Sequence, residues 1–192
     1  KPLDQLDAAV AELQAAGATL ALGAHDELVF EGAQTIVVSP GVPLSLAGLE
    51  EARRGGARIC CEVDLAPPGI APRTIGITGS NGKSTVTTML ATMAAEADCR
   101  ALAGGNLGVP ALDLLNEPEP DLYLLELSSF QLECTSSLRC AAAAVLNLSA
   151  DHIDRHGSLE NYAAAKARIF DGARIRVVNR DDERVRSMVA DD

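Results

Sequence analysis

Short apolar runs alternate with amphipathic stretches along most of this chain of 192 residues. Apolar positions recur at helical spacing from Leu3 to Leu13, Gly17 offers a stop, and a short apolar run follows over residues 18–22. The first two dozen residues therefore predict a helix and then a strand.

The same alternation continues to the end of the chain. Buried-type strands are expected over 35–38, 59–63, 74–78, 122–126, 143–147 and 174–178, and helices over 46–54, 83–96 and 159–170. Strands that alternate with helices favour parallel pairing. The pattern predicts an α/β fold with a mostly parallel sheet.

One proline-rich stretch interrupts the alternation. Pro67, Pro68 and Pro72 fall within six residues around Gly69. Because proline continues neither a helix nor a central strand, we expect a linker there and a domain boundary near residue 70. The chain then divides into domains 1–70 and 71–192.

Composition narrows the function classes. Hydrophobic residues make up 47% of the chain, and the formal charge is −11. Such an acidic chain lacks the basic footprint that nucleic acid requires, so nucleic acid is not an expected partner. The five cysteines form no C-x-x-C pair, which favours reduced thiols in the cytoplasm. No apolar run approaches the ~20 residues of a membrane span, so no membrane association is expected.

The segment from Ile75 to Thr85 joins a predicted strand to a predicted helix through a glycine-rich turn. Such a turn points successive backbone N–H groups into one concavity, which favours a polyphosphate. Lys83 can then reach the outer phosphates, and the Ser84 hydroxyl can coordinate Mg²⁺. We expect the phosphates of ATP to bind here, on Gly79, Ser80, Asn81, Gly82, Lys83, Ser84 and Thr85. The general pattern G-x-x-x-x-G-K-[ST] fails at Ile77, and the alternative is an ordinary glycine turn beside a solvated lysine.

Several segments together resemble the Mur ligases, which use ATP to build the peptide stem of peptidoglycan, and within them the enzymes that add D-glutamate. The segments that carry the resemblance are Thr78-Gly-Ser-Asn-Gly-Lys-Ser-Thr85, Gly104-Gly-Asn-Leu-Gly-Val-Pro110, Leu125-Glu-Leu-Ser-Ser-Phe-Gln-Leu-Glu133, Asn147-Leu-Ser-Ala-Asp-His-Ile-Asp-Arg155, Tyr162-Ala-Ala-Ala-Lys-Ala-Arg-Ile169 and Ser39-Pro-Gly41. Folylpolyglutamate synthetases carry a related phosphate loop.

The resemblance implies a partial Rossmann-like domain for the UDP substrate, followed by a P-loop ATPase domain. It also implies ATP-dependent addition of D-glutamate to UDP-N-acetylmuramoyl-L-alanine through an acyl phosphate, by a monomer. The family's first strand, the rest of its ATPase domain and its D-glutamate-binding third domain are expected to be absent from this chain, which by itself would not complete the ligation. The alternatives are a sibling Mur ligase or a folylpolyglutamate synthetase, and, from a different class, a nucleotide-binding module without chemistry.

Three further residues are candidates for metal binding and catalysis. Glu126 ends a predicted strand, where ligands of open parallel sheets bind, and suits Mg²⁺ shared with Ser84; a solvated strand-end carboxylate is the alternative. From the residues alone, His152 is a general base or a structural histidine, and Lys166 is a solvated helix lysine. The resemblance implies instead that His152 helps to hold a second Mg²⁺ and that Lys166 is carbamylated by CO₂ and completes that site. Lys83, His152 and Lys166 are the expected catalytic residues.

Five polar or glycine residues are expected to contact the UDP substrate. The resemblance implies this role for Ser39, Gly41, Asn106, Ser128 and Gln131. Their alternative role is to stabilise turns, which suits Asn106 between glycine-rich segments. The two remaining histidines, His25 and His156, are expected at the surface.

Overall fold

The structure is a computed structural model that describes residues 10–21, 30–106 and 108–189. Contacts divide the chain into two compact units, residues 1–34 with 44–58 and residues 35–43 with 59–192. The boundary near residue 70 stays a prediction.

In the first unit the described part of the initial helix covers residues 10–15. Residues 18–21 form no strand, so that prediction was wrong there, and the rest of the predicted segment lies outside the described residues. Helix α2, Ala47–Arg54, buries Leu49 and exposes its charged positions, as its amphipathic pattern predicts.

Two short strands and two 3₁₀ helices precede the main sheet. Strand β1, Thr35–Val37, pairs with β2, Arg58–Cys60. The 3₁₀ helices η2, Glu62–Leu65, and η3, Pro68–Arg73, follow. The segment predicted as a proline linker thus forms the helix η3. Proline suits its first turn, because the N–H that proline lacks would have no partner within the helix there.

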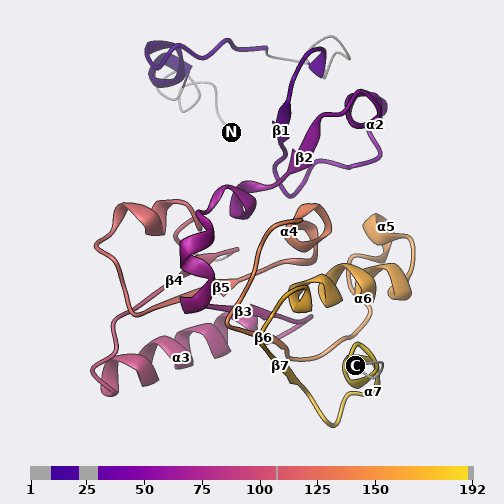
Figure 1. Cartoon of the computed structure of the whole chain (residues 1–192). Helices are drawn as coiled ribbons and strands as arrows, with labels where there is room; N and C mark the ends of the chain where they lie inside the picture. The colour runs from indigo at the N-terminus through magenta and orange to yellow at the C-terminus, as the bar shows by residue number, and fades with distance from the viewer. Residues whose placement is uncertain (1–9, 22–29, 107, 190–192) are drawn as a thin grey trace. The chain divides into compact units, whose positions relative to one another are not determined.

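The second unit is built on one five-stranded sheet in the order β4-β5-β3-β6-β7 (Figure 1). Its strands are β3 Thr74–Thr78, β4 Ala101–Gly105, β5 Leu122–Glu126, β6 Ala142–Val145 and β7 Ile175–Val178. Every adjacent pair is parallel, which confirms the predicted α/β fold. Strand β4 has no counterpart among the predicted elements.

Helices cover both faces of this sheet (Figure 1). Helix α3, Lys83–Glu96, packs on one face, and α4, Ser129–Cys134, packs with α6, Leu159–Ala167, on the other. The remaining helices are η4 Asp113–Asn116, α5 Ile153–His156, η5 Arg168–Phe170 and α7 Glu183–Ser187. The core between these layers contains Ile77, Leu124, Leu125, Val145 and Tyr162, all fully buried.

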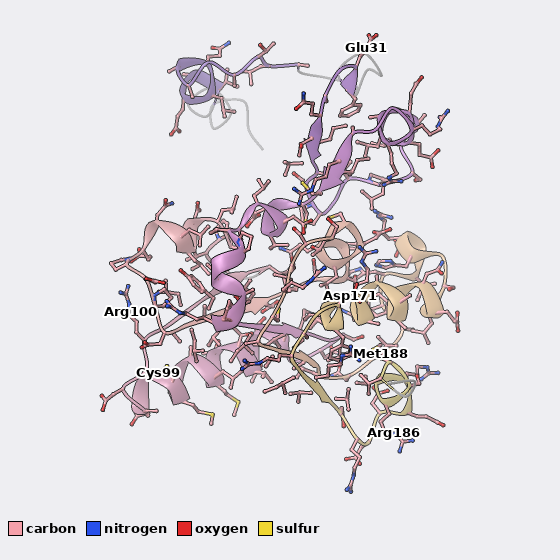
Figure 2. The ribbon with its side chains drawn as sticks, viewed as in Figure 1. Glu31, Cys99, Arg100, Asp171, Arg186 and Met188 are labelled. Carbon is pink, nitrogen blue, oxygen red and sulfur yellow. The ribbon has the colours of Figure 1, made fainter. Side chains whose placement is uncertain are left out.

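The connections into β4 and β7 lie at the amino ends of the parallel strands. Cys99 and Arg100 precede β4, and Asp171 precedes β7 (Figure 2). This edge is opposite the carboxyl ends, where the predicted site residues gather. Within the described residues, no helix combines the length and apolarity that crossing a bilayer would require.

Candidate functional site

The strand order brings three loops together at the carboxyl edge of the sheet. Strand β3 lies between β5 and β6, so the loop after β3 is flanked by the segments that follow Glu126 and Val145. Open parallel sheets bind their ligands at this edge. The predicted phosphate loop follows β3, and Glu126 is the last residue of β5. The segment that leads to Asp151 and His152 follows β6.

The phosphate loop turns into α3 at Gly82. Its φ of +80° lies in the left-handed region, which glycine enters without steric cost. The first N–H groups of a helix have no intrahelical acceptor. Among the described residues, no backbone acceptor is found for the N–H groups of Gly82, Lys83, Ser84 and Thr85. These four groups at the N-terminus of a 14-residue helix can therefore bind an anion.

The first half of the loop is bound to the segment after β6. The Ser80 N–H donates to the carbonyl oxygen of Asn147 over 3.0 Å. Asn81 donates its N–H to Asn147 Oδ1 and accepts at its carbonyl from Asn147 Nδ2, both over 2.9 Å. The backbone N–H groups of Ser80 and Asn81 are thus already paired, and within the predicted set Gly82 to Thr85 keep free ones.

The Ser80 hydroxyl is buried in a small network. It lies 3.0 Å from both the carbonyl oxygen and the amide nitrogen of Ser149, and 3.1 Å from the Tyr162 hydroxyl. Its one hydrogen goes to the Ser149 carbonyl, so the Tyr162 hydroxyl must be the donor to Ser80. Tyr162, a residue of α6, thereby links that helix to the phosphate loop.

The two predicted catalytic lysines meet at one backbone oxygen. Lys83 Nζ donates to the Gly79 carbonyl over 3.0 Å and to that of Ser80 over 3.2 Å. Lys166 Nζ donates to the same Gly79 carbonyl over 2.9 Å and to Thr78 Oγ1 over 3.3 Å. The Lys166 ammonium also lies 4.7 Å from the centre of the Tyr162 ring.

Lys166 is 1% exposed, although it lies on a helix that the sequence alone would leave solvated. Burial, and then the charge of Lys83, lower the pKa of Lys166 from its ordinary value of 10.5 to about 7, against an opposing effect of Asp151. Near neutral pH much of this amine is therefore uncharged, and only the uncharged amine reacts with CO₂.

Glu126 is a buried carboxylate with one oxygen unpaired. Its Oε1 accepts from Asn106 Nδ2 over 3.0 Å, whereas Oε2 has no hydrogen-bond partner in the described structure. Gly105, with a φ of +106°, lets the end of β4 pass close to the backbone of Glu126, because a Cβ at Gly105 would lie 2.3 Å from the Glu126 carbonyl oxygen. A buried orphan carboxylate oxygen is costly unless a cation or donor joins it, so Glu126 fits a magnesium ligand.

His152 adopts a left-handed backbone with a φ of 51° at the start of α5. Its Nε2 lies 3.5 Å from Asp151 Oδ2, and its ring centroid lies 4.9 Å from that of Phe130. The His156 ring also stacks on Phe130, with centroids 5.4 Å apart, and His156 Nε2 lies 3.0 Å from Ser129 Oγ. His156 is 8% exposed, so its predicted surface position was wrong, and burial lowers its pKa.

Ser128 and Gln131 bind each other at the start of α4. The Ser128 hydroxyl accepts from the Gln131 N–H, and Gln131 Oε1 accepts from the Ser128 N–H and hydroxyl, over 3.0–3.2 Å. This reciprocal pair is a capping box. Both residues thus have the turn-stabilising role that was the alternative to substrate contact.

Ser39 and Gly41 lie in an exposed turn after β1. The Val42 N–H donates to the Ser39 carbonyl over 2.9 Å, which closes the turn. A Cβ at Gly41 would meet nothing within 4 Å, so the turn leaves room for a ligand at this position.

The predicted metal ligands do not form a cluster by themselves. No group of three or more His, Cys, Asp or Glu side chains suited to a metal occurs among residues 10–21, 30–106 and 108–189. Ser84 lines a shallow hollow along α3 with Thr85, Thr88 and Met89. Ser84 and Glu126 each carry side-chain oxygen, the ligand atom that Mg²⁺ prefers, and Mg²⁺ commonly retains waters and binds substrate phosphates.

A cavity of about 590 Å³ lies in the first unit between residues 30–34 and helix α2. None of the predicted site residues lines it.

Sequence reasoning gave no role to Tyr162 or Asn147 and did not single out Phe130. Each falls inside a quoted family segment, which was the available signal. The roles of Asn147 and Tyr162 depend on contacts across 66 residues or more, with Asn81 and Ser80. The role of Phe130 depends on ring contacts with His152 and His156. No local pattern encodes these contacts.

Comparisons with known proteins agree with this geometry. Residues 77–192 match the family model of the Mur ligase middle domain. The UDP-N-acetylmuramoylalanine--D-glutamate ligase of Nitrosococcus oceani is 52% identical over 172 residues, which are 90% of this chain and 38% of that protein. The enzyme of the same name from Chromobacterium violaceum is 44% identical over 181 residues, 90% of this chain and 40% of that protein. The chain thus spans about two fifths of the length of these relatives.

Two solved structures share the fold at low sequence identity. A pseudomurein peptide ligase type C from Methanothermus fervidus aligns with a TM-score of 0.54 and 22% identity, over 93% of this chain and 38% of that one. The UDP-N-acetylmuramate:L-alanyl-gamma-D-glutamyl-meso-diaminopimelate ligase from Neisseria meningitides aligns with a TM-score of 0.57 and 16% identity, over 93% of this chain and 62% of that one. Because the family model covers more than half of the chain, the chain belongs to the Mur ligase family, with residues 77–192 matching the family's middle domain.

Proposed function

We propose that the protein containing this chain is an ATP-dependent ligase that adds D-glutamate to UDP-N-acetylmuramoyl-L-alanine in peptidoglycan precursor synthesis. The observation that carries the proposal is the buried amine of Lys166, bonded to the phosphate-loop carbonyl of Gly79. A nucleotide-binding module without chemistry has no use for such an amine. The names of the relatives from Nitrosococcus oceani and Chromobacterium violaceum support the choice of substrates.

In this proposal the phosphates of ATP bind at the start of α3. The free N–H groups of Gly82 to Thr85 face the phosphate oxygens, and Lys83 exchanges its bonds to the Gly79 and Ser80 carbonyls for bonds to the outer phosphates. The loop is shaped by Gly79, Ser80 and Asn81. Because Ser80 and Asn81 pair with Asn147, these two residues would position the loop.

Magnesium would be held by Glu126 and Ser84, with Lys166 and His152 at a second site. When bound, Mg²⁺ would neutralise phosphate charge so that a carboxylate can approach the γ-phosphoryl group. The unpaired Glu126 Oε2 supports the first site. The second site needs an anionic group on Lys166, which carbamylation by CO₂ would supply, and the lowered pKa of Lys166 supports that reaction.

The protein's own groups would hold the reacting atoms in line. The terminal carboxylate of the UDP substrate attacks the γ-phosphorus and ADP leaves, and the amine of D-glutamate then displaces phosphate from the acyl phosphate. Asn106 would orient Glu126 through its bond to Oε1, and Ser39 and Gly41 would offer an open turn to the diphosphate. Ser128 and Gln131 would shape the substrate side through the capping box. A cytoplasmic monomer stays a prediction.

Phosphate release by the full-length protein tests the proposal. We expect release from ATP only when UDP-N-acetylmuramoyl-L-alanine and D-glutamate are both present. Release with a folate acceptor, or with a different amino acid on a longer muramoyl peptide, would replace the proposal with one of the alternatives. ATP binding without release under any of these conditions would favour the non-catalytic module.

The role of Lys166 has its own test. Lys166→Ala should abolish phosphate release, and short carboxylic acids should restore part of it by occupying the position of the carbamate. Loss of activity without any rescue would count against a carbamate at Lys166.

A further inference from the structure

Beside the phosphate loop, the side chain of Asn147 takes the place of a backbone hydrogen-bonding partner. The backbone pairing of β3 with β6 ends at Thr78 and Val145. It continues through the Leu146 N–H, which donates to the Thr78 carbonyl over 2.9 Å, and the Ser80 N–H, which donates to the Asn147 carbonyl over 3.0 Å. At the next residue the partner of the loop is no longer backbone but the Asn147 amide.

This amide satisfies both backbone groups of Asn81. Asn147 Oδ1 accepts from the Asn81 N–H, and Asn147 Nδ2 donates to the Asn81 carbonyl, each over 2.9 Å. A primary amide is the only uncharged side-chain group that both accepts and donates in the spacing of a peptide. Serine, aspartate or leucine at this position would leave at least one of the two Asn81 groups without its partner.

Asn81 directly precedes the point where the loop turns. The next residue, Gly82, has a φ of +80°, and the free N–H groups of the helix begin there. The direction in which those N–H groups point therefore depends on how Asn81 is held. Donors that are fixed before an anion arrives cost no ordering entropy on binding.

We propose that Asn147 is a positioning residue for nucleotide binding, whose side-chain amide fixes Asn81 and thereby orients the free N–H groups of Gly82 to Thr85 toward the phosphates. This inference rests on the proposed function, because it takes the phosphates of ATP as the ligand of the loop. Asn147 itself does not touch the phosphates. The amide acts through the backbone of Asn81.

Asn179 provides a matched control. It is also an asparagine that follows a strand of the same sheet, and its Nδ2 donates to the Leu146 carbonyl over 2.9 Å while its Oδ1 accepts from the Asp181 N–H over 3.0 Å. The Asn179 side chain thus makes the same number of bonds of the same kind, but none to the phosphate loop.

The test measures the affinity of the full-length protein for ADP and ATP by calorimetry. Asn147→Ala should weaken both by about tenfold or more, since two hydrogen bonds that orient the loop are lost, whereas Asn179→Ala should stay within about twofold of the wild type. In steady-state assays Asn147→Ala should raise the KM for ATP more than it lowers kcat. Equal nucleotide affinities for the wild type and Asn147→Ala would overturn the inference.

Amide hydrogen exchange separates positioning from general stability. In Asn147→Ala the Asn81 N–H should exchange faster, while the N–H groups of the core strand β3 keep the protection that they have in Asn179→Ala. Loss of protection throughout β3 together with the loss of affinity would reduce Asn147 to a structural role and overturn the inference. If Asn147→Ala does not fold, Asn147→Asp decides, because it keeps the size and the acceptor but cannot donate to the Asn81 carbonyl while ionised. Unchanged affinity in Asn147→Asp would equally overturn the inference.

Failure of this inference is distinguishable from failure of the proposed function. A wild-type protein that binds no adenine nucleotide refutes both. A wild-type protein that binds ADP and ATP, together with an Asn147→Ala variant that binds them equally well, refutes the role of Asn147 alone.

Discussion

Lys83 and Lys166 donate hydrogen bonds to the same acceptor, the carbonyl oxygen of Gly79, over 3.0 and 2.9 Å. One lysine belongs to the phosphate loop, and the other to a helix on the opposite face of the sheet. Two ammonium groups at one oxygen repel each other, and the buried one, Lys166, loses its proton more readily. In the proposed function, this arrangement would join phosphate binding to the reactivity of Lys166.

The first prediction concerns the pH dependence of stability. The folded-state pKa of Lys166 is about 7, below its ordinary value of 10.5, so between these values the unfolded chain binds a proton that the folded chain lacks. The free energy of unfolding should therefore rise with pH across this window, by at most about 1.4 kcal/mol per pH unit, and the contribution should be flat outside it. Urea denaturation in CO₂-free buffer from pH 6 to 10 measures this slope.

Lys166→Met is the control for that slope, because methionine fills similar space without titrating. The wild type should gain stability relative to Lys166→Met as the pH rises through the window. A stability difference between the two proteins that does not change with pH would show that Lys166 keeps an ordinary pKa.

Removal of the Lys83 charge should raise the pKa of Lys166. In Lys83→Met one of the causes that lower this pKa is gone, and burial, the larger cause, remains, so the pKa should rise but stay below 10.5. The ¹³C chemical shift of the Lys166 side chain, followed against pH in CO₂-free buffer, measures the change. Arg100→Met is the control, because it removes a positive charge at the amino edge of the sheet. It should leave the pKa of Lys166 unchanged. A Lys166 pKa in Lys83→Met that is equal to or lower than that of the wild type would contradict an effect of the Lys83 charge on Lys166.

Asn106→Ala should weaken magnesium binding through Glu126. Asn106 Nδ2 donates to Glu126 Oε1, and loss of an outer partner of a metal ligand typically costs about 10–100-fold in metal affinity. We expect the Mg²⁺ concentration for half-maximal phosphate release to rise about tenfold in the full-length protein. Asn179→Ala should not change it. An unchanged magnesium requirement in Asn106→Ala would separate Asn106 from the metal site.

Ser128→Ala should lower the free energy of unfolding by about 1 kcal/mol, because helix α4 loses its N-terminal cap. Ser128→Thr should retain most of the cap. Ser158→Ala removes the equivalent cap of α6 and should cost a similar amount. If Ser128 also contacts the UDP substrate, Ser128→Ala raises the KM for that substrate and Ser158→Ala does not. No loss of stability in Ser128→Ala would contradict the capping role.

The sequence predicted the central part of the sheet well. Strands β3 and β5 and helix α3 have the predicted bounds, because buried apolar runs and a glycine turn define them locally. Strand β4 was missed because Ala101-Leu-Ala-Gly-Gly105 contains no β-branched or aromatic residue. Its extended conformation comes from its pairing with β5, which the local sequence does not encode.

The candidate site was predictable in its residue types and not in its burial. Lys166 lies in an alanine-rich stretch whose apolar positions mark no distinct face, so the pattern could not show that the lysine points inward. Glu126 ends a strand, and its buried carboxylate accepts a bond from Asn106, which follows the neighbouring strand β4. Both features come from tertiary packing.

The central claim is that the buried amine of Lys166 takes up CO₂ beside the phosphate loop and completes a ligase site. The direct measurement is the ¹³C NMR spectrum of the full-length protein equilibrated with ¹³C-bicarbonate and Mg²⁺. The account predicts a carbamate carbonyl resonance in the wild type that is absent from Lys166→Met and tracks phosphate release when CO₂ is removed and restored. An active wild-type enzyme without that resonance, or the same resonance in Lys166→Met, would contradict the claim.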